Sequence, residues 1–376
     1  MSKKVLFCAS TVSHILNFHL PYLQSFKAAG YEVHVLVNES AQIPWADQVH
    51  IIPFQKQLLS PINIKAIFQA RVLLRKERFD VISTNTTLAG LIVRAAVRLM
   101  GKKRPQVCHL VHGYLFGYSD GWKKWIYLVP ELIVAPITDK LLVMNHEDQE
   151  IAQKYHLYRK KLYYVHGMGV DPERGKIVDR QKKIEMRTLR GYRQDQFLFV
   201  YLAEFSKRKN QSELIQAFSL LKRENVLLLL GGEGKTKETC QQLVHKLHLE
   251  EKIHFLGYVT DVTSLYQICD CVVSSSKIEG LPFHIMEAEG CGLPIIASDI
   301  KGHRELVREG YNGYLYQDKM ELTQKMEMVA GLPEQILWKM GMRSKEQFSS
   351  CTLDQVKGKI LEFYALPRSQ NDIFSS

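Results

Sequence analysis

The sequence lacks a hydrophobic run long enough to cross a membrane as a helix. Such a helix needs about 18 or more apolar residues, but residues 125–144, the nearest candidate, contain two prolines and three charged residues. The N-terminus has only the short apolar run VLFCA behind two lysines, which predicts a first strand rather than a signal peptide. We therefore expect a cytoplasmic protein.

The sequence also lacks paired cysteines, low-complexity segments and short repeats. The seven cysteines are odd in number, form no C-x-x-C pair and mostly lie in apolar runs, which is typical of buried thiols in a reducing compartment. This pattern argues against a disulfide framework or a cysteine-based zinc site. The cysteines are at positions 8, 108, 240, 269, 271, 291 and 351.

Acidic residues are scarce in the first half of the chain. Residues 1–176 contain 23 Lys and Arg against 13 Asp and Glu, whereas the remaining residues contain 27 against 26. A basic face indicates an anionic partner such as a phosphorylated lipid, a membrane surface or nucleic acid, although lysine-rich solvated turns also explain it. No nucleic-acid module is present and the basic residues are not interleaved with stacking aromatics, so we expect no nucleic-acid partner.

Short apolar runs alternate with helix-length amphipathic segments from one end of the chain to the other. Uniformly apolar strands separated by helices are typical of parallel sheets covered on both faces. With 376 residues, this alternation predicts two doubly wound α/β domains. The expected strands include 4–9, 31–37, 49–54, 80–84, 106–112, 140–145, 162–166, 197–205, 225–234, 252–258, 269–276 and 294–299.

The domain boundary is expected in a segment rich in glycine and charge, 165–183. We assign 1–175 to the first domain and 176–352 to the second; the predicted helix in 353–376 can finish the second domain or pack back on the first. Ligands of open α/β sheets bind beyond the carboxyl ends of the strands, so the cleft between two such domains is the expected active site.

The segment IEGLPFHIMEAEG (278–290) places carboxylates around a helix start. Pro282 is suited to open a helix, and Gly280 lets backbone approach a ligand. Free amides and the dipole at a helix start attract anions such as a diphosphate, while Glu287 suits a ribose diol. Alternatively, Glu279 caps the helix and Glu287 pairs with a lysine.

These residues resemble glycosyltransferase family 4, the retaining sugar-nucleotide transferases with the two-domain GT-B architecture. Besides EGLPFHIMEAEGCGLPIIASD, the chain has AEFSKRKNQ, GGEGK, FLGYVTDVTSLYQICDCVVSSS and KGHRELV in the family's order. FDVISTNT and VHGYLFG match in the first half. The resemblance is greatest to bacterial enzymes that build capsular or exopolysaccharide units on a lipid carrier.

The resemblance implies roles for individual donor-binding residues. Glu287 holds the nucleotide ribose, and Glu279 contacts hydroxyls of the donor sugar near the reacting carbon. Lys209, helped by Arg208 or Lys207, neutralises the departing diphosphate, a place where a fixed cation stabilises developing charge. The remaining implied contacts are the amides of Gly280, Leu281 and Phe283 with the diphosphate, and Tyr258 with the base.

His112, in VHGYLFG, is expected at a strand end, where the family places a histidine against the donor sugar and the acceptor. His14, His19 and His109 lack comparable support. The chain departs from the family at Glu204, where many members have an arginine. It also departs in the first loop, CASTVSHILNFHLP, which lacks the paired glycines often found there and is expected to serve the acceptor instead.

The resemblance implies transfer of a sugar from a nucleotide diphosphate, most often UDP, to a hydroxyl of a polyprenyl-diphosphate-linked or growing glycan. It implies retention of anomeric configuration and no metal or other cofactor. The basic clusters of the first half, with Trp122 and Trp125, then suit docking on the anionic inner face of the cell membrane. Two alternatives are a sugar-nucleotide epimerase of similar architecture and a non-catalytic basic scaffold.

Overall fold

The computed structural model describes residues 2–55, 60–101 and 104–367 and forms two compact units. One unit comprises Met1–Gly169 with Asp354–Ser376, and the other comprises Val170–Leu353. The expected boundary at residue 175 thus lies six residues beyond the observed division. The final helix, which the sequence left unassigned, belongs with the first unit.

The first unit contains a seven-stranded sheet in the order β3-β2-β1-β4-β5-β6-β7, with every pair parallel. The central strands are apolar and buried on both faces, as the uniform hydrophobic runs require. The strands are β1 (Lys4–Cys8), β2 (Glu32–Val37), β3 (Gln48–Ile51), β4 (Val81–Thr84), β5 (Gln106–Leu110), β6 (Lys140–Val143) and β7 (Lys161–Tyr164).

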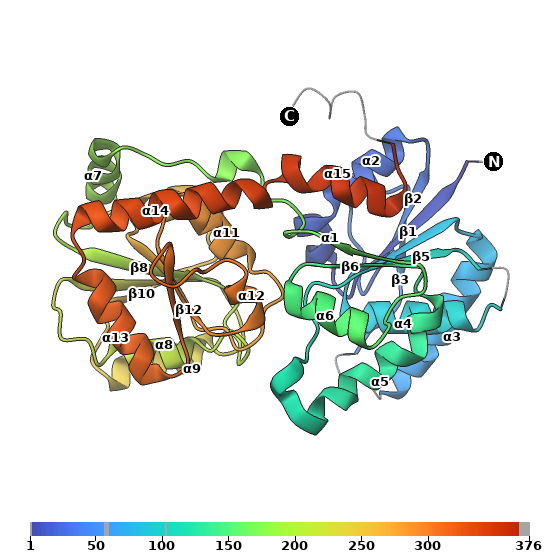
Figure 1. Ribbon diagram of the computed structural model, residues 1–376, viewed down its shortest axis with the longest axis horizontal. Coiled ribbons are helices and arrows are strands. Elements are labelled where there is room, and N and C mark those ends of the chain that lie inside the picture. The colour runs from blue at the N-terminus through green and yellow to red at the C-terminus, as the bar shows by residue number, and fades with distance from the viewer. Residues whose placement is uncertain (1, 56–59, 102–103, 368–376) are drawn as a thin grey trace. The chain divides into compact units, whose positions relative to one another are not determined.

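Helices cover both faces of this sheet (Figure 1). Leu6 and Cys8 of β1 pack toward α3 and α4, whereas Phe7 between them packs toward α2 and α15, as the two-residue period of a strand demands. The helices are α1 (Val12–Phe18), α2 (Leu20–Ala28), α3 (Pro61–Glu77), α4 (Thr87–Arg98), α5 (Trp125–Val134), α6 (His146–Lys154) and α15 (Leu353–Tyr364).

The last helix is tied to the first unit by polar as well as apolar contacts. The Tyr364 hydroxyl lies 2.7 Å from Oγ of Ser83 in β4, and Lys140 Nζ donates to the Phe363 carbonyl at 2.7 Å. The Tyr364 ring also lies against Phe7 and Phe26. A buried hydroxyl pair of this kind gives α15 a defined register on the sheet.

Residues 8–21, which were predicted to form the first loop, are mostly helical. Helix α1 occupies Val12–Phe18, and His19 is its C-cap. Val12 and Ile15 are buried three residues apart, and no glycine or proline interrupts the segment, so one apolar face suffices to form two turns of helix.

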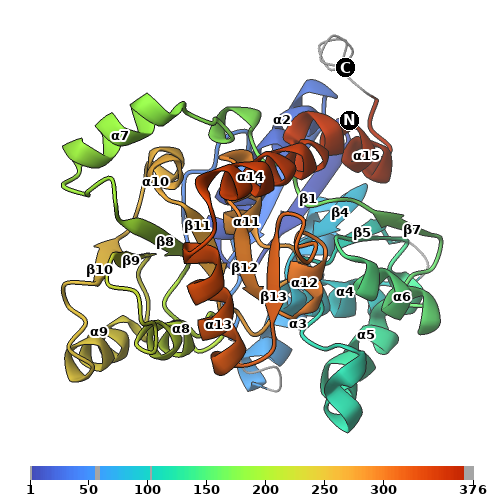
Figure 2. The same ribbon diagram turned by 60° about the vertical axis from the view of Figure 1, so that its left-hand side comes forward.

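The second unit contains a six-stranded parallel sheet in the order β10-β9-β8-β11-β12-β13 (Figure 2). α8, α9 and α13 share a hydrophobic core with one face of it, while α11 packs against α14. The strands are β8 (Phe197–Leu202), β9 (Val226–Gly231), β10 (Ile253–Gly257), β11 (Cys271–Ser274), β12 (Ile295–Ser298) and β13 (Gly313–Tyr316). The helices are α7 (Arg180–Leu189), α8 (Gln211–Phe218), α9 (Lys237–Lys246), α10 (Val262–Ile268), α11 (Phe283–Gly290), α12 (Lys301–Arg304), α13 (Lys319–Ala330) and α14 (Glu334–Phe348).

The fold class predicted from the sequence, two doubly wound α/β domains, is confirmed. All seven cysteines are free and buried, as their positions in apolar runs indicated. In the part of the chain that the structure describes, no helix combines the length and apolar character needed to cross a membrane.

Candidate active site

Three consecutive serines at the carboxyl end of β11 hold the loops around it. Ser275 Oγ donates to the backbone carbonyls of Lys209 and Asn210 at 3.0 and 3.1 Å. Ser276 Oγ donates to Glu279 Oε1 at 2.7 Å, and Ser274 Oγ lies 3.1 Å from His303 Nε2. The strand end therefore fixes the positions of Lys209 and Glu279 relative to each other.

Glu279, Lys209 and Arg208 form one ion-paired cluster. Lys209 Nζ donates to Glu279 Oε1, and Arg208 Nη1 lies 3.4 Å from Glu279 Oε2. Burial raises the pKa of Glu279, but the Lys209 ammonium and the Arg208 guanidinium outweigh it and lower that pKa to about 2. Glu279 is thus a charged acceptor held by two cations. It does not cap α11, contrary to the alternative interpretation given above.

Two glycines of the quoted motifs permit close backbone contacts in this region. A Cβ on Gly302 would lie 2.6 Å from the Glu279 carbonyl oxygen, so only glycine lets α12 approach the 279–280 loop. Gly232 has φ +130°, and a Cβ there would lie 2.1 Å from the Ala203 carbonyl oxygen. Both motifs therefore shape the loops around the cluster.

Helix α11 starts beside this cluster. It begins at Phe283 with Pro282 as its N-cap, one residue later than predicted, because Pro282 has an extended ψ of 116°. Gly280 and Leu281 are buried directly before it. The predicted diphosphate contacts therefore lie at the positive end of a helix dipole, next to the Lys209 and Arg208 side chains.

Glu287, in the second turn of α11, pairs with an arginine rather than the lysine of the alternative interpretation. Arg174 Nη1 donates to Glu287 Oε1 at 2.9 Å. Burial raises the pKa of Glu287, although the Arg174 hydrogen bond opposes this rise. Glu289, the third acid of the segment, is fully buried and accepts from Asn312 Nδ2 at 3.4 Å, which indicates a structural role.

Tyr258 is not part of this hydrogen-bonded cluster. It directly follows β10, and 79 % of its surface is exposed. Among the described residues it forms no recorded hydrogen bond or ring contact, so its predicted proximity to a nucleotide base stays a prediction.

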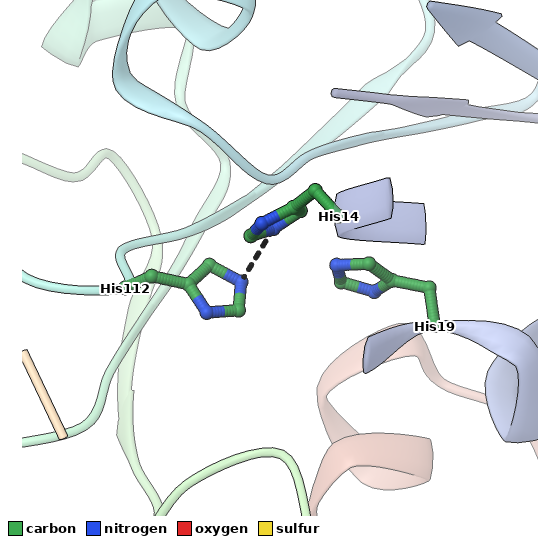
Figure 3. A group of neighbouring side chains, drawn as sticks. All are labelled: His14, His19 and His112. Atoms are coloured by element: carbon green, nitrogen blue, oxygen red, sulfur yellow. Dashed lines mark hydrogen bonds between the residues drawn. The ribbon is translucent and has the colours of Figure 1, made fainter. Parts of the chain in front are cut away.

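His112 belongs to the first unit, where it lies beside His14 and His19 (Figure 3). The Nε2 atoms of His14 and His112 are 3.3 Å apart, and the His19 ring lies 5.7 Å from that of His112 between centroids. Burial lowers the pKa of all three imidazoles, to about 4 for His14, so they are neutral at pH 7. No role for His14 or His19 was predicted from the sequence.

Two further acids have surroundings that restrict their roles. Asp270 is the acid of the CDC segment, and its carboxylate accepts from Arg187 Nη2 at 2.6 Å, Lys183 Nζ at 2.8 Å and the Leu198 amide at 2.8 Å. These contacts make it a structural anion. Glu204 is exposed and acidic, so this position, where the family resemblance implied an arginine, supplies no cation.

Comparison with known proteins identifies the family of this chain. The model for Glycosyltransferase Family 4 matches residues 22–174, and the model for Glycosyl transferases group 1 matches residues 183–334. EpsD of Bacillus subtilis (strain 168), which carries the name of a glycosyltransferase, is 33 % identical over 339 residues, covering 89 % of each chain. The chain belongs to glycosyltransferase family 4. It is therefore a glycosyltransferase, as the resemblance implied.

Two other proteins extend the comparison. An Escherichia coli relative named UDP-Gal:alpha-D-GlcNAc-diphosphoundecaprenol alpha-1,3-galactosyltransferase is 27 % identical over 261 residues, covering 68 % of this chain and 67 % of its own. The crystal structure of Anabaena HepE in complex with UDP matches with a TM-score of 0.76 at 19 % identity, covering 96 % and 99 % of the two chains. The latter likeness confirms the GT-B fold of this glycosyltransferase.

Sequence reasoning missed several residues of the site. Ser275, Ser276 and His303 are polar residues at strand ends or just beyond them, which is a usable signal because such positions face ligands in parallel sheets. Arg174 gave no such signal, since it lies in the predicted interdomain segment, 113 positions before Glu287.

Proposed function

We propose that this glycosyltransferase is a retaining enzyme that uses a UDP-sugar and acts on a polyprenyl-diphosphate-linked or growing glycan in capsule or exopolysaccharide synthesis. The observation that carries the donor assignment is the cluster of Glu279 with Lys209 and Arg208 at the start of α11. The cations and the helix dipole complement a diphosphate, while the carboxylate complements sugar hydroxyls.

In the proposed reaction the bond between the anomeric carbon and the diphosphate oxygen breaks, and the electron pair leaves with the nucleoside diphosphate. Lys209 and Arg208 stabilise that growing negative charge. The acceptor oxygen bonds to the anomeric carbon on the same face, and its proton passes to the departing diphosphate. Glu279 orients the sugar, Glu287 holds the ribose, and His112 contacts the sugar on the acceptor side.

The proposed reaction needs no metal or other cofactor. Lys209 and Arg208 supply the positive charge that a cation would otherwise bring to the diphosphate, and Asp270, the acid of the CDC segment, is already saturated by Arg187, Lys183 and a backbone amide. We expect donor cleavage to persist in excess EDTA; loss of cleavage that Mg²⁺ or Mn²⁺ restores would contradict this assignment.

The first test is slow donor hydrolysis across UDP-, GDP- and dTDP-sugars, followed as release of nucleoside diphosphate. Release from one donor, together with transfer to an undecaprenyl-diphosphate glycan, supports the proposal. The NMR spectrum of the product should show that the α configuration of the donor is kept. Isomerised donor without released diphosphate would indicate an epimerase. No release and no nucleotide binding with any donor would overturn the donor assignment.

The proposed lipid-linked acceptor requires the enzyme to work at a membrane surface, and we place it at the cytoplasmic face. The first unit offers an exposed apolar stripe along α5 and the preceding 3-10 helix (Tyr118–Lys124). Lys123 and Lys124 adjoin it. The stripe, named here the α5 stripe, consists of Trp122, Trp125, Ile126, Val129 and Ile133, with 44 to 73 % of each residue exposed.

Replacing Trp122 and Ile126 of the α5 stripe by serine is expected to weaken binding to anionic vesicles by at least about 10-fold, because burying each large side chain contributes about 1.5–3 kcal/mol. The measurement is co-sedimentation with phosphatidylglycerol vesicles. Trp338→Ser is the matched control, since Trp338 in the second unit is 64 % exposed. Equal loss in the control, or no loss in the stripe variant, would contradict membrane docking through α5.

A further inference from the structure

Three histidines from two distant parts of the chain meet at the carboxyl edge of the first sheet. His14 lies in α1, His19 is the residue between α1 and α2, and His112 follows β5. His14 and His112 are 98 positions apart. Among the described residues, these three form the one group of His, Cys, Asp and Glu side chains whose arrangement suits a metal ion.

The spacing of the ring nitrogens fits a metal centre. Tetrahedral zinc binds imidazole nitrogens at about 2.0–2.1 Å, which places two such ligands about 3.4 Å apart. The Nε2 atoms of His14 and His112 are 3.3 Å apart, and one nitrogen from each of the three rings lies within 4.8 Å of the others. A zinc ion bound by all three rings would draw the His19 nitrogen closer to the other two.

His19 is the second, independent sign of a ligand. Its side chain is fully buried, yet neither ring nitrogen has a hydrogen-bond partner among the residues that the structure describes. Leaving such a buried polar group without a partner is destabilising, and a metal ion would satisfy it. Figure 3 shows its ring beside the His14–His112 pair.

The composition of the group also suits a metal ion. It consists of imidazoles alone, without a carboxylate, and imidazole is a donor that zinc-class ions favour. The His14 ring also hydrogen-bonds the backbone of Asn85, the kind of contact that orients ligating histidines. His14 and His112 are only half-buried, so the site is open to entry from solvent.

We infer that His14, His19 and His112 bind one divalent transition-metal ion of the zinc class, with a fourth position open to water. Three imidazoles suit zinc, nickel or copper rather than magnesium or calcium. The site is additional to the proposed metal-independent reaction. Cysteine spacing gave no sign of it because its ligands are histidines that only the tertiary fold brings together.

Metal binding would inhibit transfer, and this consequence rests on the proposed function of His112. The ion would occupy His112, the residue proposed to contact the donor sugar. Zinc would then act as a reversible inhibitor that EDTA relieves.

The direct test is equilibrium dialysis of ZnCl₂ against the full chain without an affinity tag and without any sugar donor. We expect one zinc per chain, and a loss of affinity of more than about 10-fold in His19→Phe, since even outer-shell changes cost about 10–100-fold. His245→Asn is the control, because the His245 side chain is 83 % exposed and outside the group. Absence of stoichiometric binding, or equal binding by His19→Phe, would overturn the site.

Two further measurements distinguish loss of the metal site from misfolding of His19→Phe. Phenylalanine at position 19 removes two unpaired nitrogens beside Phe7, so we expect no loss of thermal stability without zinc. Zinc should raise the Tm of the wild type alone. If His19→Phe does not fold, Co²⁺ bound to the wild type decides: intense visible absorption supports a tetrahedral site, and a weak octahedral spectrum contradicts it.

Donor hydrolysis with and without ZnCl₂, each protein scaled to its own zinc-free rate, tests the inhibitory role. Inhibition of the wild type that is weakened in His19→Phe supports it. Binding without inhibition keeps the metal site but contradicts the role of His112 at the sugar. If no protein hydrolyses any donor, the donor assignment fails while the dialysis result still decides the metal site.

Discussion

Replacing Lys209 by methionine is expected to reduce donor cleavage by about 100- to 1000-fold, the usual cost of removing a fixed donor from developing charge. The stem of methionine fills much of the volume left by a buried lysine, so the loss reflects charge rather than a cavity. The measurement is kcat for release of nucleoside diphosphate at saturating donor. Lys207→Met is the matched control, because Lys207 is an exposed neighbour on the same loop.

The same substitution is expected to destabilise the fold, because it leaves Glu279 buried with Arg208 as its remaining cation. Breaking a buried ion pair costs about 3–5 kcal/mol. The double variant Lys209→Met with Glu279→Gln removes the unpaired charge, so it should regain stability without regaining activity. Activity that recovered with stability would show that Lys209 acts only in folding.

The pKa of Glu279 also predicts how the stability of Lys209→Met depends on pH. Its pKa falls from the ordinary 4.5 to about 2, a difference that corresponds to about 3 kcal/mol of stability. This contribution is complete at neutral pH and is lost as the pH falls from about 4.5 toward 2. Without Lys209 the Glu279 pKa rises, so acid unfolding of Lys209→Met should begin at a higher pH than in the wild type.

Replacing Glu287 by alanine is expected to weaken UDP binding by about 10- to 100-fold, because hydrogen bonds to a charged group contribute about 1.5–3 kcal/mol. Isothermal titration calorimetry with UDP measures this directly. Because Glu287 in the proposed site binds only the ribose, kcat at saturating donor should change much less than in Lys209→Met. Unchanged UDP affinity would contradict the ribose assignment.

The substitution Arg174→Met removes the cation that pairs with the Glu287 carboxylate. Burial raises the pKa of Glu287 and Arg174 opposes that rise, so the pKa rises further in this variant. A protonated Glu287 accepts fewer ribose hydrogen bonds. UDP affinity should therefore decline at a higher pH in Arg174→Met than in the wild type as the solution is acidified, while both proteins bind at pH 8.

The elements that the sequence predicted well are those whose signal is local. The apolar runs that became β1, β8 and β11 are mostly hydrophobic over four to six residues, and such runs are typical of parallel strands that are buried on both faces. The helix start at Phe283 was predicted within one residue, because proline restricts the backbone at that point. The first helix was missed because its apolar face comprises only Val12 and Ile15.

The two doubly wound domains and, through the ordered motifs, the family were predictable from the chain alone. Both depend on hydrophobic periodicity and short spacings, which are properties of neighbouring residues. Three assignments required the folded chain: α15 belongs with the first unit, Arg174 pairs with Glu287, and His14 and His19 lie beside His112. These contacts join residues far apart in sequence, and their free energy comes from burial and charge pairing that exist only after the sheets have formed.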